Sequence, residues 1–166
     1  MATVFFFHIH CTNSSNDAAA QLMVNTGNSI QGKAVKILDG DTFDLLLPDK
    51  TVRRIRLYGI DCPERKQPYY QAAKDFLGHA LQSANILVTI RDKDRYGRTV
   101  GVVLANHQNI NEALLRAGLG WHYRRYDRNL DWSDLEKEAR RKHAGLWADL
   151  TPIPPWAFKH PKTRKR

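Results

Sequence analysis

The chain has 166 residues, enough for one domain with a hydrophobic core and too few for two domains of ordinary size. A hydrophobic content of 42% and an aromatic content of 10% are typical of a globular protein and exclude a disordered chain. With 26 Lys and Arg against 17 Asp and Glu, the net charge is +9, which favours a polyanionic partner such as nucleic acid.

The first 29 residues are expected to lie outside the folded domain. Their apolar stretch, Val4 to Ile9, is short, is interrupted by His8 and has no Lys or Arg before it. The small residues at 18–20 are typical of a cleavage site. We interpret residues 1–29 as a disordered N-terminal extension or a degenerate export signal. The sequence contains no run of about 18 apolar residues, so it predicts no membrane span.

From Ile30 onward, alternating apolar residues predict five strands. Tight turns at residues 39–41 and 48–49 separate the first three, which form a meander, and a polar loop, DKDRYGR, joins the last two. The strands are expected around Val35 and Ile37 and at residues 43–47, 52–58, 86–91 and 99–104.

Three helices are predicted after the meander. The first runs to Leu81 with Pro68 in its first turn, and the second extends from residue 111 to 117 with Asn111 as its cap. The third is expected to begin at a capping box formed by Ser133 and Glu136 and to stop near residue 145.

Five strands with one helix between the third and fourth, followed by two helices, predict an α+β, mainly β fold. The expected architecture is a five-stranded OB-fold barrel with three helices, occupying residues 30–150. Residues 151–166 are expected to be a flexible basic tail, because KHPKTRKR carries five Lys and Arg in eight residues. This tail either adds attraction to phosphates or serves only solubility.

Three polar segments fall at strand ends of this barrel, where residues distant in sequence can meet. They supply three carboxylates and two guanidinium groups, from Asp41, Asp61, Glu64, Arg56 and Arg98. Carboxylates are hard ligands suited to calcium or magnesium, and arginine forks bind phosphate oxygens bidentately. A remaining carboxylate can orient or deprotonate an attacking water. The set therefore predicts a phosphodiester hydrolysis site.

Each segment also has a purely structural interpretation. Arg56 can form a surface ion pair with Asp61 or Glu64, which is the usual fate of such neighbours. Residues 39–41 can be a plain hairpin turn, since Asp-Gly is a favoured turn pair. Residues 94–98 can be only a basic turn. The joint presence of the segments, in this order, favours the hydrolytic interpretation.

The sequence resembles the staphylococcal nuclease (thermonuclease) family from about residue 32 to residue 147. The similarity is carried by DGDT at 39–42, RLYGIDCPE at 56–64, DRYGR at 94–98, NEALLRAGL at 111–119 and AGLW at 144–147. The resemblance implies a calcium-dependent, sugar-nonspecific endonuclease on an OB-fold barrel. Such an enzyme hydrolyses DNA and RNA with little sequence preference and leaves 3′-phosphate ends.

The resemblance also implies the ligands of a calcium ion. Asp41 and Asp61 would supply carboxylate oxygens. Cys62 stands where the family uses a main-chain carbonyl, often from threonine, and a cysteine can supply that carbonyl equally well.

The remaining site residues are implied in the same way. Glu64 would act on the attacking water as general base or positioner, and Arg56 and Arg98 would bind the scissile phosphate and stabilise the transition state. The family's tyrosines that pack on the terminal nucleotide lie just after the second helix. Tyr123 and Tyr126 are the candidates here, and ordinary barrel-side aromatics are the alternative.

A protein of a different class remains open. A non-catalytic OB-fold module that binds single-stranded nucleic acid uses a basic groove and stacking aromatics. It would have no need for Glu64 together with Asp41 and Asp61, so hydrolysis is the preferred interpretation. Nothing in the sequence indicates an oligomer, and a monomer is expected. The resemblance favours a secreted or periplasmic location, where calcium is abundant.

Overall fold

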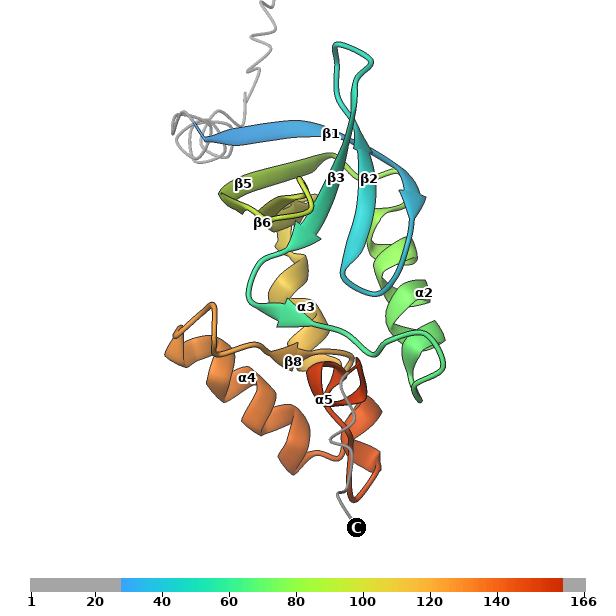
Figure 1. The fold of residues 1–166 in the computed structure, drawn as a ribbon, viewed down its shortest axis with the longest axis vertical. Coiled ribbons are helices and arrows are strands. Elements are labelled where there is room, and N and C mark those ends of the chain that lie inside the picture. Colours follow the sequence, from blue (N-terminus) through green and yellow to red (C-terminus); the bar gives the residue numbers. More distant parts are fainter. Residues whose placement is uncertain (1–27, 160–166) are drawn as a thin grey trace, which may run out of the picture.

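The computed structural model describes residues 28–159 (Figure 1). The predicted N-terminal extension or export signal falls outside this range except for its last two residues, and residues 160–166 of the predicted basic tail also fall outside it. Within the described range, no helix combines the length and the apolar character that crossing a bilayer requires.

A closed barrel forms the upper part of the molecule in Figure 1. Its strands follow the order β3-β2-β1-β5-β6, and β3 also pairs in parallel with β6, which closes the sheet. They are β1 (Ser29–Ile37), β2 (Thr42–Leu46), β3 (Val52–Leu57), β5 (Ile86–Lys93) and β6 (Thr99–Ala105). Short β7 (Gln108–Asn109) extends β6, and β4 (Ile60–Asp61) pairs separately with β8 (Trp121–His122).

The helices lie beside and beneath the barrel (Figure 1). They are α2 (Tyr70–Leu81), α3 (Ile110–Arg116), α4 (Leu130–Arg141), the 3-10 helix η1 (Gly145–Ala148) and α5 (Pro155–Lys159). The predicted α+β, mainly β class with a five-stranded OB-type barrel is confirmed. The structure adds α5, a short helix in the segment that was expected to be a flexible tail.

The start of α4 differs from the prediction. The helix begins at Leu130, and the side chain of Asn129 caps it by accepting hydrogen bonds from the next free backbone N–H groups. The predicted capping box is therefore wrong: Ser133 and Glu136 lie inside the helix, buried, and face β8. The helix ends at Arg141, four residues before the expected stop.

The predicted cap of α3 is also displaced by two residues. Asn109 is the cap, and Asn111 is fully buried within the first turn. The Asn111 side-chain oxygen accepts from the Val103 N–H at 3.0 Å, and its amide donates to the Tyr58 carbonyl at 2.8 Å. Asn111 thus fastens α3 to β6 and to the end of β3.

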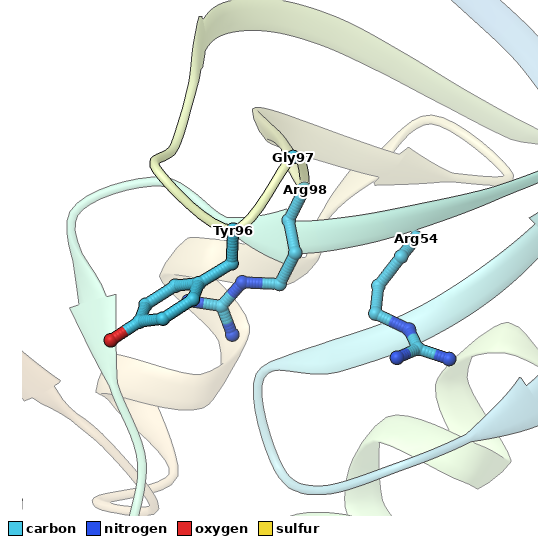
Figure 2. A pocket seen from close by; sticks show the side chains of 4 residues that line it. All are labelled: Arg54, Tyr96, Gly97 and Arg98. Atoms are coloured by element: carbon cyan, nitrogen blue, oxygen red, sulfur yellow. The ribbon is translucent and has the colours of Figure 1, made fainter.

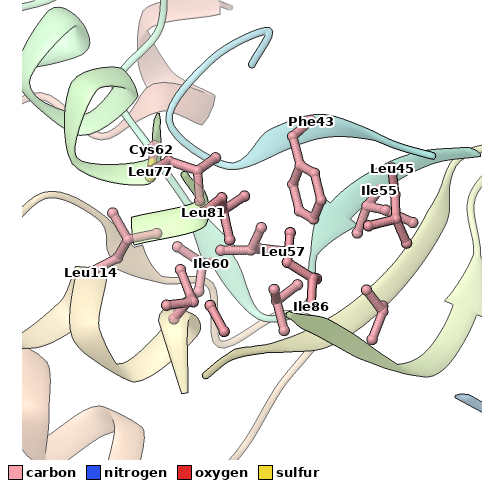
Figure 3. Close-up of a cluster of buried hydrophobic side chains, with 14 of the residues drawn as sticks. Phe43, Leu45, Ile55, Leu57, Ile60, Cys62, Leu77, Leu81, Ile86 and Leu114 are labelled. Atoms are coloured by element: carbon pink, nitrogen blue, oxygen red, sulfur yellow. The ribbon is translucent and has the colours of Figure 1, made fainter. Parts of the chain in front are cut away.

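The hydrophobic core lies between the barrel and the two helices α2 and α3 (Figure 3). Phe43 and Ile55 point inward from β2 and β3, while Leu77 and Leu114 come from the helices, and all four are fully buried. Burying one such side chain contributes about 1.5–3 kcal/mol. The core therefore fixes α2 and α3 beneath the strand ends that carry the predicted site residues.

Replacing a helix residue of this core should destabilise the whole domain. We expect Leu77→Ala to lower the free energy of unfolding by about 2–5 kcal/mol, because it leaves a cavity in a fully buried region. Leu130→Ala is the matched control, since Leu130 is 77% exposed, and it should change the value by less than about 0.5 kcal/mol. Urea unfolding measures both, and equal losses would contradict the placement of α2 on the core.

Candidate active site

Arg56 joins two of the predicted carboxylates at the mouth of the barrel. Its Nη1 lies 2.7 Å from Asp41 Oδ2, and its Nη2 donates to Asp61 Oδ1 at 2.8 Å. The three side chains are only 15%, 8% and 9% exposed, respectively. We call Arg56, Asp41 and Asp61 the Arg56 triad. The structural alternative of a surface ion pair does not describe it, because the charges are largely buried.

Backbone contacts hold Asp41 in place. In the ladder between β2 and β3, Thr42 is the partner of Arg56, so Asp41 stands directly beside that arginine's strand. Asp41 Oδ2 accepts from the Cys62 N–H at 2.8 Å, and its carbonyl accepts from the Leu57 N–H at 2.9 Å. The loop after β4 and the end of β3 are therefore both tied to one aspartate.

A third carboxylate, Asp39, lies next to the triad, and the sequence interpretation did not assign it a role. Burial first, and then the charge of Asp41, raise the pKa of Asp39 to about 7. For Arg56, burial lowers the pKa of the guanidinium. The negative charges of Asp41 and Asp61 outweigh burial, so the pKa of Arg56 is raised. The site therefore concentrates more negative charge than one guanidinium balances.

Cys62 is buried directly behind this loop. Burial, and then the negative charge of Asp41, raise the pKa of the thiol well above its usual range, so the group stays protonated. Its Sγ donates to the Gly40 carbonyl at 3.3 Å. A side chain at Gly40 would begin 2.9 Å from the Cys62 Cβ and 2.6 Å from that of Ala73, so only glycine fits. These contacts exclude Cys62 as a thiolate nucleophile and leave its predicted role to the main chain.

Glu64 lies in the loop between β4 and α2, three residues beyond Asp61, and is half-buried. A turn fixes its backbone: the Glu64 carbonyl accepts from the Gln67 N–H at 2.8 Å, and the Glu64 N–H donates to Gln67 Oε1 at 2.7 Å. The catalytic carboxylate expected from the sequence thus lies on a short loop that two hydrogen bonds hold in place. This loop comes directly after Asp61 of the triad in the sequence.

Arg98 reaches the same outer face of the barrel from the loop between β5 and β6. Ile55 and Thr99 are parallel partners and both are buried, so Arg56 and Arg98, as their neighbours in sequence, project to the other side of the sheet. Asp94 orients Arg98, accepting from its Nε at 2.6 Å.

The Arg98 guanidinium also borders an open pocket of about 410 Å³ (Figure 2). Arg54, Tyr96 and Gly97 complete the lining, and the Arg98 guanidinium lies 5.7 Å from the centre of the Tyr96 ring. Arg54 is held by Asp44 through two bonds of 2.8 and 3.2 Å. Two guanidinium groups beside an aromatic ring suit a phosphate-bearing ligand.

The two candidate tyrosines lie next to residues 61–64, here called the acidic loop, because β4 pairs with β8. In this ladder Asp61 is opposite Trp121, and the Tyr123 N–H donates to the Gly59 carbonyl at 2.8 Å. The rings of Tyr123 and Tyr126 meet edge to face, 5.0 Å apart, and Tyr126 is 64% exposed. Residues 123–128, here called the tyrosine loop, therefore border the predicted site.

His122 fixes the base of this loop and does not itself face a substrate. Its side chain is fully buried, with Nδ1 3.0 Å from Ser133 Oγ and Nε2 2.8 Å from Asp127 Oδ2. Its backbone N–H donates to Glu136 Oε2 at 2.7 Å. These bonds explain why Ser133 and Glu136 turn inward from α4, and they anchor the tyrosine loop to that helix.

The donor set fits a hard divalent cation. The Asp41 and Asp61 carboxylates lie close enough together to share one guanidinium, which is a pair of hard oxygen donors in one place. Within residues 28–159, no three His, Cys, Asp or Glu side chains converge as a complete metal cage. An ion held here would therefore take its other ligands from carbonyls or water.

A buried acidic pair bridged by one arginine, with a second arginine on the same barrel, suits a phosphate-directed hydrolase of the OB-fold class. Residues 54–149 match the family described as staphylococcal nuclease homologues. An uncharacterised endonuclease of Escherichia coli O157:H7 is 40% identical over 134 residues, covering 80% of this chain and 87% of the relative. A micrococcal nuclease of Shigella flexneri is 39% identical over 140 residues, covering 78% and 80%.

The chain belongs to the staphylococcal nuclease family. The match also extends to a larger protein, a staphylococcal-like nuclease of Arabidopsis thaliana, which is 42% identical over 109 residues that cover 34% of its length. The family predicted from the sequence motifs is thus confirmed, and with it the expectation of a nuclease-type hydrolase.

Arg56 should be the residue on which local stability depends most. In calcium-free buffer we expect Arg56→Met to lower the free energy of unfolding by about 3 kcal/mol, because two buried carboxylates lose their counter-charge. Arg54→Met is the matched control: Arg54 is 48% exposed and pairs with one carboxylate, so its loss should be below about 1 kcal/mol. Equal effects in denaturant unfolding would show that the triad is not the stabilising element.

Proposed function

We propose that the protein is a calcium-dependent, sugar-nonspecific endonuclease that hydrolyses phosphodiester bonds of DNA and RNA and leaves 3′-phosphate ends. The observation that carries this proposal is the Arg56 triad, in which two buried carboxylates and a guanidinium meet at the barrel mouth. The net charge of +9 suits a polyanionic substrate. The relatives named as endonucleases and nucleases point to the same reaction class.

The proposed ion site consists of Asp41, Asp61 and the main-chain carbonyl of Cys62. Calcium bound there would supply positive charge to a phosphate oxygen. Asp41 is already oriented by the Cys62 N–H and by the Thr42 hydroxyl, which donates to Oδ1 at 3.1 Å. This fixed geometry favours ligation, because the carboxylate would not have to be ordered on binding.

The proton-transfer and charge-stabilising roles fall to the other residues. Glu64, whose loop is held by two hydrogen bonds to Gln67, would orient or deprotonate the attacking water. Arg56 and Arg98, on one face of the barrel, would bind the equatorial oxygens of the phosphate as its negative charge grows. Tyr126, exposed beside the acidic loop, would pack on a base of the substrate.

Cleavage assays test the reaction and the assignment of Glu64 together. With calcium, the wild-type chain should cut single- and double-stranded DNA and RNA, and excess EGTA should abolish cutting. We expect Glu64→Gln to lower kcat by about 100-fold or more, because a positioned base contributes about that much. Glu138→Gln is the matched control, since Glu138 is exposed on α4 and pairs with Arg141, and it should leave kcat unchanged.

The chemistry of the product ends tests the direction of cleavage. A 3′-phosphate blocks extension by a polymerase until a phosphatase removes it, whereas a 3′-hydroxyl is extended at once. Products that are extended without phosphatase would contradict the proposed bond specificity. Tight binding of single strands without any cutting would instead support the non-catalytic OB-fold module.

Calcium with a nucleoside 3′,5′-bisphosphate should raise the thermal stability of the protein. The cation would add positive charge beside Asp41 and Asp61, which share one guanidinium, and binding at 100 times Kd contributes about 2.7 kcal/mol. Differential scanning fluorimetry in calcium or EGTA measures the shift. Asp61→Asn should lose the response, whereas Asp131→Asn, at the solvent-exposed start of α4, should keep it. An unchanged melting temperature for the wild type would contradict the ion site.

A further inference from the structure

Residues 151–156 turn back onto the candidate site and are here called the C-terminal strap. They lie beyond the family match, which ends at residue 149. The strap follows η1 and ends in the first residues of α5, which Figure 1 places beside β8. Two independent contacts join it to groups that the proposed reaction uses.

The first contact is a bridge through Gln67, whose side chain is almost fully buried at 7% exposure. Its Oε1 accepts from the Glu64 N–H at 2.7 Å, and its Nε2 donates to the Ile153 carbonyl at 2.9 Å. One amide therefore uses both its ends to tie the Glu64 loop to the strap. A buried amide that lost either partner would leave a polar atom unsatisfied, which is unfavourable.

The second contact is the stacking of Trp156 on Tyr123. The two rings are 10° from parallel with centroids 5.0 Å apart, so the indole covers one face of the tyrosine. Trp156 also meets Trp121 edge to face at 6.4 Å, yet it keeps 38% of its surface exposed. A base that approaches the tyrosine loop therefore meets the indole as well as the exposed ring of Tyr126.

We propose that the C-terminal strap is part of the nuclease site, with Gln67 as the positioning residue for Glu64 and Trp156 as an additional base-stacking side chain. The proposal rests on the proposed function. Gln67 acts through the Glu64 backbone and therefore affects the chemical step. Trp156 acts on a substrate base and therefore affects binding.

The bridge is tested with Gln67→Met, which keeps the size of the side chain and removes both hydrogen bonds. We expect kcat on a single-stranded oligonucleotide to fall about tenfold with KM within about twofold, because a misplaced catalytic group slows chemistry. Gln71→Met is the matched control, since Gln71 is exposed on α2 and bonds only to Asp75 in the described chain. An unchanged kcat for Gln67→Met would overturn the assignment.

A double-mutant cycle separates positioning from a general structural effect. If Gln67 acts through Glu64, Gln67→Met should add less than about twofold to the loss already caused by Glu64→Gln. Multiplicative losses would mean that Gln67 supports the fold in general and does not position Glu64. Measurement well below the melting temperature of each variant keeps unfolding out of the comparison.

The stacking role is tested by binding to the Glu64→Gln protein, which does not depend on turnover. We expect Trp156→Ala to weaken binding of a single-stranded oligonucleotide about tenfold and Trp156→Phe to restore most of the affinity. Phe158→Ala is the matched control, because Phe158 lies on the same helix with 39% exposure and should have little effect. Equal affinities for Trp156→Ala and the Glu64→Gln parent would overturn the role of Trp156.

The two proposals fail in distinguishable ways. If the wild-type chain does not cut in calcium, the proposed function fails, and the binding arm still decides whether Trp156 contacts nucleic acid. If the wild type cuts and both Gln67→Met and Trp156→Ala behave as their controls do, the nuclease stands and the strap is only a structural tail.

Discussion

The whole site depends on how two buried carboxylates are kept beside one guanidinium. Asp41 stands directly before β2, Asp61 lies in β4 and Arg56 lies in β3, so these three parts of the chain have to come together before the charges can compensate one another. Unpaired charges of this kind are costly to bury, and a well-oriented pair roughly offsets that cost. The triad therefore adds little net stability when complete, but it allows only one register of β2 against β3.

The register imposed by the triad also positions its neighbours. Arg56 opposite Val100 places Arg98 on the same outer face, and the Cys62 N–H bound to Asp41 sets the start of the loop that carries Glu64. The chemistry proposed for this protein requires carboxylates and guanidinium groups within a few ångströms of one phosphate. A small barrel achieves this with local turns, because strand ends converge at its mouth.

Polar contacts reinforce the attachment of the tyrosine loop to this site. The two-residue ladder between β4 and β8 includes buried His122, which is bonded to Asp127 and Ser133. Glu136 adds bonds to the His122 backbone and to Arg140. Such networks are strong when every member is satisfied and weaken sharply when one is lost.

The sequence indicated the barrel and the triad because both follow from local signals. Alternation of apolar residues predicted the strands, and the charged residues stood at their ends. The capping box at Ser133 failed for a physical reason: the pattern is local, but His122, eleven residues away, binds both of its polar side chains. Asn129 also satisfies the capping rule, so the local pattern alone did not discriminate between the two starts.

The strap contacts had no comparable signal. Gln67 and Ile153 are 86 residues apart, and an isolated glutamine gives no indication of a partner. Two prolines before Trp156 are compatible with a helix start, since proline suits the first turn, but a basic composition suggested a flexible tail. Contacts between segments so distant in sequence arise from packing, which periodicity and turn signals do not encode.

The charges of the molecule act over two different distances. Arg124, Arg125 and Arg128 are exposed on the tyrosine loop and form no ion pair with any side chain in residues 28–159, so they contribute to the field that draws a polyanion toward the site. That field is screened within about 8 Å at physiological salt. Arg56, largely buried between two carboxylates, is screened much less. In the proposed function, attraction of substrate and stabilisation of the reacting phosphate would therefore fall to separate arginines, and a change in salt would act mainly on the first.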